Sequence, residues 1–117
     1  MNIESFRAHC IAKRGVTEEF PFDKTTLVFK VMGKMFALTD VDLFEGINLK
    51  VDPEEGAAMR DTYDFVQEAY HMKNRHWVTV VVTPAVSEPL LKAWIDRSYE
   101  LVVQGLTKSK KSALNSL

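Results

Sequence analysis

The residues best suited to binding chemistry are concentrated between positions 70 and 77, where the sequence reads YHMKNRHW. One interpretation is a pocket in which His71 and His76 bind a ligand, a metal or a phosphate, with Tyr70 and Trp77 as apolar walls. The alternative, which is favoured, is that His71 fixes the loop by hydrogen bonding to the backbone while Trp77 fills the core. As a metal site the two histidines lack an assured third ligand, although His9 or an aspartate could supply one. No metal or other cofactor is therefore expected.

A second candidate is a set of basic side chains on predicted strands, turns and loops. Its members are Lys30, Lys34, Lys50, Lys73 and Arg75, with Lys24 nearby. Mobile cations at such spacing suit the backbone phosphates of DNA, and a hairpin tip that carries Lys34 could enter a groove. The alternative is that these side chains only solubilise a half-exposed sheet and discourage edge pairing. Acidic residues in neighbouring segments could also cancel the positive electrostatic potential of these basic side chains. They are Glu18, Glu19, Asp40, Asp42 and Glu45.

Other reactive residue types give no catalytic arrangement. Cys10 lies on the apolar side of the first predicted helix, with nothing nearby in sequence to lower its thiol pKa, so we expect a packing residue. Ser98 falls on a buried stripe, where its hydroxyl is expected to bond a backbone carbonyl. No nucleophile elbow or phosphate-binding glycine loop is present, since the 5 glycines are scattered. We therefore expect a protein that is not an enzyme.

The charge balance limits the DNA-binding hypothesis. The chain has 15 Lys and Arg against 16 Asp and Glu, a formal net charge of −1. Non-specific nucleic-acid binders usually carry a large positive excess, because they replace counterions along the phosphate backbone. DNA binding by this chain would therefore need basic residues segregated to one surface.

Length and composition indicate one domain. The 117 residues suffice for a single core, and an apolar content of 46% is that of a globular protein. We expect the domain to span residues 1–106, followed by a flexible basic tail at 107–117. Its lysines, Lys108, Lys110 and Lys111, could add weak affinity for nucleic acid. The single cysteine excludes an internal disulfide, and no signal peptide or bilayer-length apolar run is visible, so a cytoplasmic location without membrane contact is expected.

The elements that would position these side chains begin with a helix and a hairpin. Asn2 can cap the first helix and Gly15 can end it. Phe20 and Phe22 alternate around Pro21, which suggests an edge strand. Gly33 and Lys34 are predicted to form a two-residue turn, which would put Phe29 opposite Leu38 and give the hairpin one apolar face. That face consists of Leu27, Phe29, Val31, Phe36 and Leu38.

The second half of the sequence predicts two more strands and two helices. Ile47, Leu49 and Val51 alternate as a strand, and Asp52-Pro53 begins a helix that should run to about Asp64. Residues 76–83 form a strand that is apolar on both sides and therefore central. Ser87 caps the last helix, whose buried stripe is Leu91, Trp94, Ile95, Ser98, Leu101 and Val102.

The predicted order is α-β-β-β-β-α-β-α, an α+β fold with an antiparallel sheet of about five strands and all helices on one face. The other face would stay open. It would carry Lys30, Met32, Met35, Asn48 and Lys50.

Several short segments, taken together, resemble the MmcQ/YjbR family. They are Glu19-Phe20-Pro21-Phe22, Phe29-Lys30-Val31-Met32-Gly33-Lys34-Met35-Phe36-Ala37, Leu49-Lys50, Tyr70-His71-Met72, His76-Trp77 and Ser98-Tyr99-Glu100-Leu101-Val102. They run in family order from about residue 4 to 106. The family usually reads Asn then Lys after the His-Met pair, whereas this chain has Lys73-Asn74.

The resemblance implies a CyaY-like, frataxin-type fold and a family labelled as DNA-binding. The iron-handling role of frataxin does not transfer, since it depends on an acidic ridge along the first helix. Here that helix offers only Glu4 against Arg7, Lys13 and Arg14.

The leading hypothesis is double-stranded DNA binding through the open sheet face and the hairpin, with Lys30, Lys34 and Lys50 on phosphates. The alternative is a module that binds another protein, a second copy of itself or a small ligand. It would use an apolar patch of Val28, Met32 and Met35, or the segment from His71 to Trp77.

Overall fold

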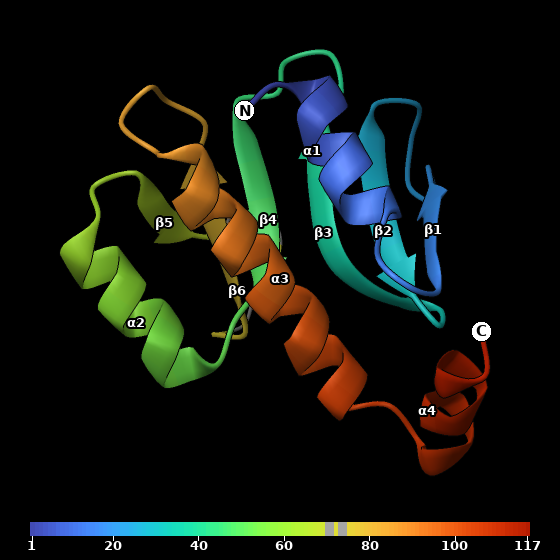
Figure 1. Cartoon of the computed structure of the whole chain (residues 1–117). Helices are drawn as coiled ribbons and strands as arrows, with labels where there is room; N and C mark the ends of the chain where they lie inside the picture. Colours follow the sequence, from blue (N-terminus) through green and yellow to red (C-terminus); the bar gives the residue numbers. More distant parts are fainter. Residues whose placement is uncertain (70–71, 73–74) are drawn as a thin grey trace.

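The computed structural model of this chain describes residues 1–69, 72 and 75–117. It forms one six-stranded antiparallel sheet in the order β1-β2-β3-β4-β6-β5. Helices α1, α2 and α3 lie on one face of that sheet, and α4 lies beside the turn between β2 and β3 (Figure 1). The elements are α1 (Ile3–Ile11), β1 (Val16–Glu19), β2 (Thr26–Val31), β3 (Lys34–Asp40), β4 (Gly46–Lys50), α2 (Pro53–Thr62), β5 (Val66–Glu68), β6 (Trp77–Val81), α3 (Glu88–Gln104) and α4 (Lys108–Asn115).

The α+β class and the antiparallel sheet are confirmed, as is the order of the predicted elements. Strand β5 and helix α4 are additions to that order. Strand β6 lies between β4 and β5, so it is an interior strand as its two apolar sides predicted.

The three larger helices begin at the residues that the sequence marks as caps. Asn2 accepts a hydrogen bond from the amide of Ser5 and completes a capping box at α1. Asp52 accepts the amide of Glu54 at 3.0 Å, just before the proline that begins α2. Ser87 accepts the amide of Leu90 at the start of α3. These caps satisfy amide donors that the first helical turn leaves unpaired, so they fix where each helix starts.

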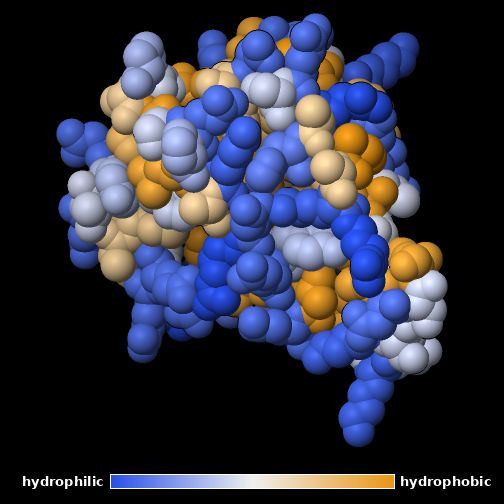
Figure 2. All heavy atoms as spheres, in the orientation of Figure 1, coloured by the Kyte–Doolittle hydropathy of each residue, from blue (hydrophilic) through white to orange (hydrophobic). Residues whose placement is uncertain are grey.

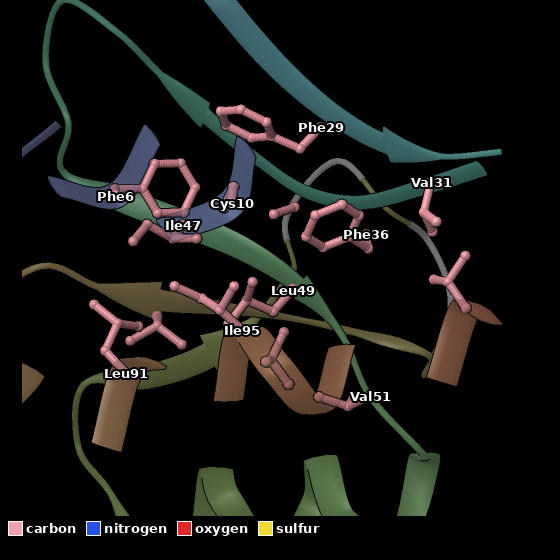
Figure 3. Close-up of a cluster of buried hydrophobic side chains, with 14 of the residues drawn as sticks. Phe6, Cys10, Phe29, Val31, Phe36, Ile47, Leu49, Val51, Leu91 and Ile95 are labelled. Carbon is pink, nitrogen blue, oxygen red and sulfur yellow. The ribbon is translucent and has the colours of Figure 1, made fainter. Parts of the chain in front are cut away.

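The main core lies between the sheet and the helices. Phe6 and Cys10 of α1 and Leu91 and Ile95 of α3 point into it and are at most 2% exposed (Figure 3). They meet strand side chains from one sheet face: Leu27, Phe29, Val31, Phe36, Ile47, Leu49, Val78 and Val80. These helices therefore bury their apolar stripes on the same face, as predicted.

The turn of the β2–β3 hairpin differs from the predicted one. Val31 pairs with Lys34, so the two turn residues are Met32 and Gly33 rather than Gly33 and Lys34. Both have positive φ, 50° at Met32 and 83° at Gly33. Two left-handed residues in succession form the type I′ turn that matches the twist of a hairpin, and here Met32 accepts the conformation usually taken by Asn or Gly.

A bulge in β3 changes which side chains share a face. Lys30 pairs with Met35 and Phe29 with Ala37, so Phe36 is an extra residue without a partner in β2. The prediction that Phe29 faces Leu38 is therefore wrong, because Leu38 pairs with Val28. Leu38 points to the face opposite the helices.

The hydroxyl of Ser98 on α3 forms hydrogen bonds with the backbone at the bulge. It donates to the carbonyl of Phe36 at 2.5 Å and accepts the amide of Lys50 at 2.8 Å. The ladder between β3 and β4 stops at the pair Ala37–Leu49, so these two backbone groups would otherwise lack partners. The predicted bond from Ser98 to a backbone carbonyl is confirmed, and the hydroxyl also bridges two strands.

An edge strand is present, but the prediction that it contains Phe20 and Phe22 is wrong. Strand β1 ends at Glu19, and Phe20, Pro21 and Phe22 follow in an irregular segment. Phe20 is 50% exposed and Phe22 is 64% exposed. Since Pro21 has no amide hydrogen, the segment leaves the sheet and places two aromatic rings at the surface.

Helix α4 replaces the flexible tail expected at 107–117. Thr107 caps it by accepting the amide of Lys110, and Leu114 is 5% exposed in the main core. Leu114 lies over Gly15, where an added Cβ would be 2.5 Å from Leu114 Cδ1. The prediction that Gly15 ends α1 is wrong, since the helix ends at Ile11 with Ala12 as its cap. With φ at +74°, Gly15 forms the turn before β1 and admits α4 against this corner.

Candidate functional site

The face of the sheet that the helices leave uncovered is only partly open. Val28 and Leu38 pack there with Trp77 and Ala69, each at most 8% exposed, and form a second apolar cluster. Met35 and Met72 pack against the edge of this cluster. The predicted apolar patch of Val28, Met32 and Met35 does not form, because Val28 is buried and Met32 packs against the main core.

The predicted phosphate-contacting residues differ in exposure and in pairing. Lys30 is ion-paired with Glu19, with 2.8 Å between Nζ and Oε2, and its side chain is 23% exposed. Lys50 is half-buried, whereas Lys34 beside the hairpin turn and Arg75 are exposed. Lys73 lies outside the described residues. Lys34 is therefore the predicted contact that is both exposed and at a protruding turn.

The predicted histidine pocket can be located only in part. Tyr70 and His71 lie outside the described residues. Trp77 is 6% exposed and fills the second cluster, as its core interpretation predicted. His76 is exposed at the start of β6, and its backbone carbonyl accepts the amide of Val51.

A concavity of about 600 Å³ lies beside the second cluster on the same face. Its floor comes from β3, β4 and β6, and its rim from the segment between β1 and β2 and from the end of β3. The lining residues are Phe22, Asp23, Thr26, Leu38, Thr39, Asp40, Gly46, Asn48, Met72 and Thr79. Sequence reasoning missed this site, because the bulge that turns Leu38 toward it leaves no pattern in the sequence.

Basic side chains gather at the end of the molecule formed by the β2–β3 turn and α4. Val16 pairs with Val31, so Arg14 and Gly15 lie level with that turn. The Gly15 Cβ position is 3.6 Å from the sulfur of Met32 and in contact with Leu114. This arrangement brings five cations to one end, which we call the basic end: Arg14, Lys34, Lys108, Lys110 and Lys111. Figure 2 shows hydrophilic side chains projecting there, over α4 at the lower right.

No ion pair among residues 1–69, 72 and 75–117 neutralises the basic end. The last 17 residues contain three lysines and no Asp or Glu. The five cations are therefore available to an external anion.

Acidic side chains gather at the opposite end of the hairpin. Thr26 pairs with Asp40, so the segments before β2 and after β3 lie together, far from the turn. They carry Asp23, Asp40, Asp42 and Glu45 against one cation, Lys24. A chain with almost no net charge thus has oppositely charged ends, which is the segregation that the composition alone could not reveal.

A polar cluster ties α1 to α3. Asp96 Oδ1 lies 2.7 Å from His9 Nε2 and also accepts a hydrogen bond from Lys13 Nζ. Partial burial on its own would raise the pKa of the Asp96 carboxyl, but the bonds from Lys13 and His9 outweigh it and hold that pKa below its usual range. The Tyr99 hydroxyl donates to the carbonyl of Arg14 at 2.6 Å. These contacts fasten the end of α1 that leads into the basic end.

This cluster predicts an acid-sensitive contribution to stability. The pKa of Asp96 is depressed in the folded chain, so its contribution is complete above the unfolded value of about 4 and is lost as the pH falls through the folded value. Asp96→Asn should therefore lower the free energy of unfolding more at pH 7 than at pH 3. Urea unfolding at both pH values measures the difference, with exposed Asp61→Asn as control. Equal losses at the two pH values would show that the carboxylate charge contributes nothing.

The remaining reactive groups are built into the scaffold. Burial raises the pKa of the Cys10 thiol to about 12, so the thiol stays protonated at neutral pH. This supports the prediction that Cys10 is a packing residue. In the part of the chain that the structure describes, no three His, Cys, Asp or Glu side chains are placed to hold a metal ion. None of the helices there is long and apolar enough to traverse a bilayer.

Comparison with solved structures finds the same fold in two bacterial proteins. The crystal structure of Deinococcus radiodurans protein DR2400, with domain DUF419, superposes with a TM-score of 0.90 at 36% identity. The match covers 97% of this chain and 88% of that one. A Pseudomonas syringae protein superposes with a TM-score of 0.72 at 26% identity, covering 86% and 98% of the two chains.

Sequence comparison gives matching relatives. YbdF of Escherichia coli O157:H7 is 38% identical over 90 residues, which cover 76% of this chain and 74% of that protein. YjbR of Escherichia coli K12 is 26% identical over 118 residues and covers both chains fully. Both are described as uncharacterized proteins. The model of the YjbR family matches residues 11–101, most of the chain. The chain belongs to the YjbR family.

Proposed function

We propose that this domain acts by binding rather than by catalysis, and that its basic end contacts the phosphate backbone of double-stranded DNA. One observation carries the proposal: α4 packs beside the β2–β3 turn and joins its lysines to Lys34 and Arg14, at an end without a neutralising carboxylate among the described residues. Because Lys34 is exposed, the hairpin turn is part of the proposed contact surface. That surface lies at the end of the sheet, not on the uncovered sheet face that the sequence predicted.

The geometry suits a polyanion. Duplex DNA carries one negative charge per about 1.7 Å of its axis, and an eight-residue helix is about 12 Å long, so α4 and the turn together span several phosphates. The acidic end lies at the far end of the hairpin. Repulsion between that end and DNA would orient the approaching molecule with the basic end forward.

Lys30 and Lys50 are expected to contribute less than Lys34. The Lys30 ammonium is already paired with Glu19, and binding a phosphate would require that pair to be broken or shared. Lys50 is half-buried on the uncovered sheet face, level with Phe36 of β3, so it is less accessible than the exposed Lys34. A Lys30→Glu/Lys50→Glu variant therefore distinguishes binding by the sheet face from binding by the basic end.

The proposal predicts that Lys34→Glu/Lys108→Glu weakens DNA binding at least about tenfold at low salt, because two phosphate contacts become repulsions. Lys108 is the first residue of α4, where a glutamate suits the helix dipole, so folding should be kept. Fluorescence anisotropy with a labelled duplex measures the affinity.

The matched control is Lys24→Glu/Lys92→Glu, which makes the same charge change outside the basic end. It should bind within about twofold of wild type, apart from the general effect of net charge. If both variants weaken DNA binding equally, net charge alone explains the loss and the basic end is not the contact surface. If only Lys30→Glu/Lys50→Glu weakens binding, the sheet face is the contact. No retention of duplex by the wild type at low salt would exclude the proposal.

A further inference from the structure

We infer that the concavity on the uncovered sheet face binds a small organic cation, a primary ammonium or guanidinium carried on a short apolar body. This site is separate from the basic end and does not depend on DNA binding. Its volume of about 600 Å³ lies within the range of small-molecule sites. Three features of its lining select the ligand class: a polar floor, two carboxylates at the rim, and apolar side chains between them.

The floor holds a polar pair in a fixed orientation. Thr79 Oγ1 donates to Asn48 Oδ1 at 2.5 Å across β6 and β4. The amide nitrogen of Asn48 and a lone pair of Thr79 Oγ1 are left to face a ligand. At Gly46 a Cβ would lie 3.0 Å from the methyl of Thr79, so this glycine keeps the floor deep.

The rim carries two carboxylates held by their own loops. Asp23 accepts the amides of Thr26 and Thr25, at 2.6 and 2.9 Å, and these backbone bonds lower the pKa of its carboxyl. Asp40 Oδ1 accepts the amides of Asp42 and Leu43, which fixes the side chain at the end of β3. The second oxygen of Asp40 accepts no hydrogen bond from the described residues. The loops therefore orient both negative charges before a ligand arrives.

No cationic side chain lines the concavity among the residues that the structure places there. An anionic ligand would meet two carboxylates without compensation, whereas a cation would gain from both. Two carboxylates with threonine hydroxyls are a sparse set for a divalent metal, but as acceptors they suit the several N–H donors of an ammonium or guanidinium group.

The apolar lining requires a ligand with a hydrophobic body. Leu38 and Met72 form an apolar wall next to the second cluster. Phe22 stands at the rim and is 64% exposed, so its ring can move over a bound cation and interact through its π face. Contact with a bound ligand would bury this exposed ring and would account for an aromatic residue in the loop before β2.

Titration of the ¹⁵N-labelled chain with phenethylammonium, followed by amide chemical shifts, tests the inference. Saturable shifts are expected at Thr26, Gly46, Asn48 and Thr79, with a Kd in the millimolar range for so small a probe. The isosteric anion 3-phenylpropionate and the neutral 2-phenylethanol should give much smaller shifts at the same amides. Equal shifts with all three probes, or none at these amides with phenethylammonium, would overturn the inference.

Asp40→Asn keeps the loop acceptor and removes the charge, and it should weaken phenethylammonium binding about tenfold. Asp42→Asn removes a charge two residues away whose side chain does not line the concavity, so it should leave the affinity nearly unchanged. Equal weakening by both variants would indicate general attraction to the acidic end and would overturn the assigned site. The amide spectrum shows directly whether each variant is folded, and DNA binding should be the same in both.

Discussion

Ser98→Ala is expected to lower the free energy of unfolding by about 3 kcal/mol, because it leaves two buried backbone groups without partners. The hydroxyl of Ser98 is fully buried and bonds both the Phe36 carbonyl and the Lys50 amide. Alanine is the better helix former, which offsets this loss by about 0.5 kcal/mol.

Urea unfolding of Ser98→Ala and of Ser112→Ala distinguishes two contributions to the free energy of unfolding: the loss of the Ser98 hydrogen bonds and the higher helix propensity of alanine. Ser112 is exposed on α4, so its replacement should be neutral or slightly stabilising. A Ser98→Ala variant as stable as the wild type would mean that the bulged backbone finds other partners. The bridging role would then be refuted.

Leu114→Ala is expected to release α4 from the domain at a cost of about 2–4 kcal/mol, the range for truncating a buried leucine. Leu114 is the buried residue of α4, and the helix has only eight residues, so it has little stability of its own. The sheet and the other helices should stay folded. The lysines of α4 would then be mobile, and DNA binding should weaken as their positions are lost.

Hydrogen exchange measures this effect locally. Amides of α4 should exchange much faster in Leu114→Ala, while those of β2 and β3 remain protected. Leu43→Ala, which truncates a leucine that is 64% exposed, is the matched control and should change neither group. Unchanged exchange of α4 in Leu114→Ala would show that other contacts hold the helix in place.

The elements that can be predicted from the sequence are those with a local signal. Caps at Asn2, Asp52 and Ser87 and the alternation through Ile47, Leu49 and Val51 depend on neighbours in the chain, and the structure has them. The buried stripe of α3, including Ser98, follows from helical spacing alone. Such features can be predicted from nearby residues because they depend on helix caps and on which residues share one face of a helix or strand, and not on how the elements pack together.

The features that the sequence does not reveal depend on contacts distant in the chain. The bulge at Phe36 needs Ser98, 62 residues away, to satisfy its carbonyl. The turn cannot be placed from its residues, since Met32 takes a left-handed conformation that methionine rarely adopts. A one-residue shift sends Leu38 to the other face, and the concavity depends on that shift.

The basic end cannot be predicted from the sequence either, because it also depends on contacts between residues that are distant in the chain. The pattern indicates Lys34 as a phosphate contact, whereas the lysines of α4 lie in a segment whose composition is typical of a flexible tail. Leu106 and Leu114 flank that Ser- and Lys-rich segment and are 7% and 5% exposed. The cap at Thr107 and this spacing are the available signals. Gly15, at the far end of the sequence, provides the space into which α4 packs.

The salt dependence of duplex binding tests the central claim most directly, since that claim is that five uncancelled cations form one contact surface. The slope of log Kobs against log salt is predicted to be about −4 to −5 for the wild type, from five phosphate contacts at about 0.9 each. Its magnitude should fall by about 2 in Lys34→Gln/Lys108→Gln and stay unchanged in Lys24→Gln/Lys92→Gln. A slope near zero in the wild type, or the same decrease in both variants, would contradict the claim.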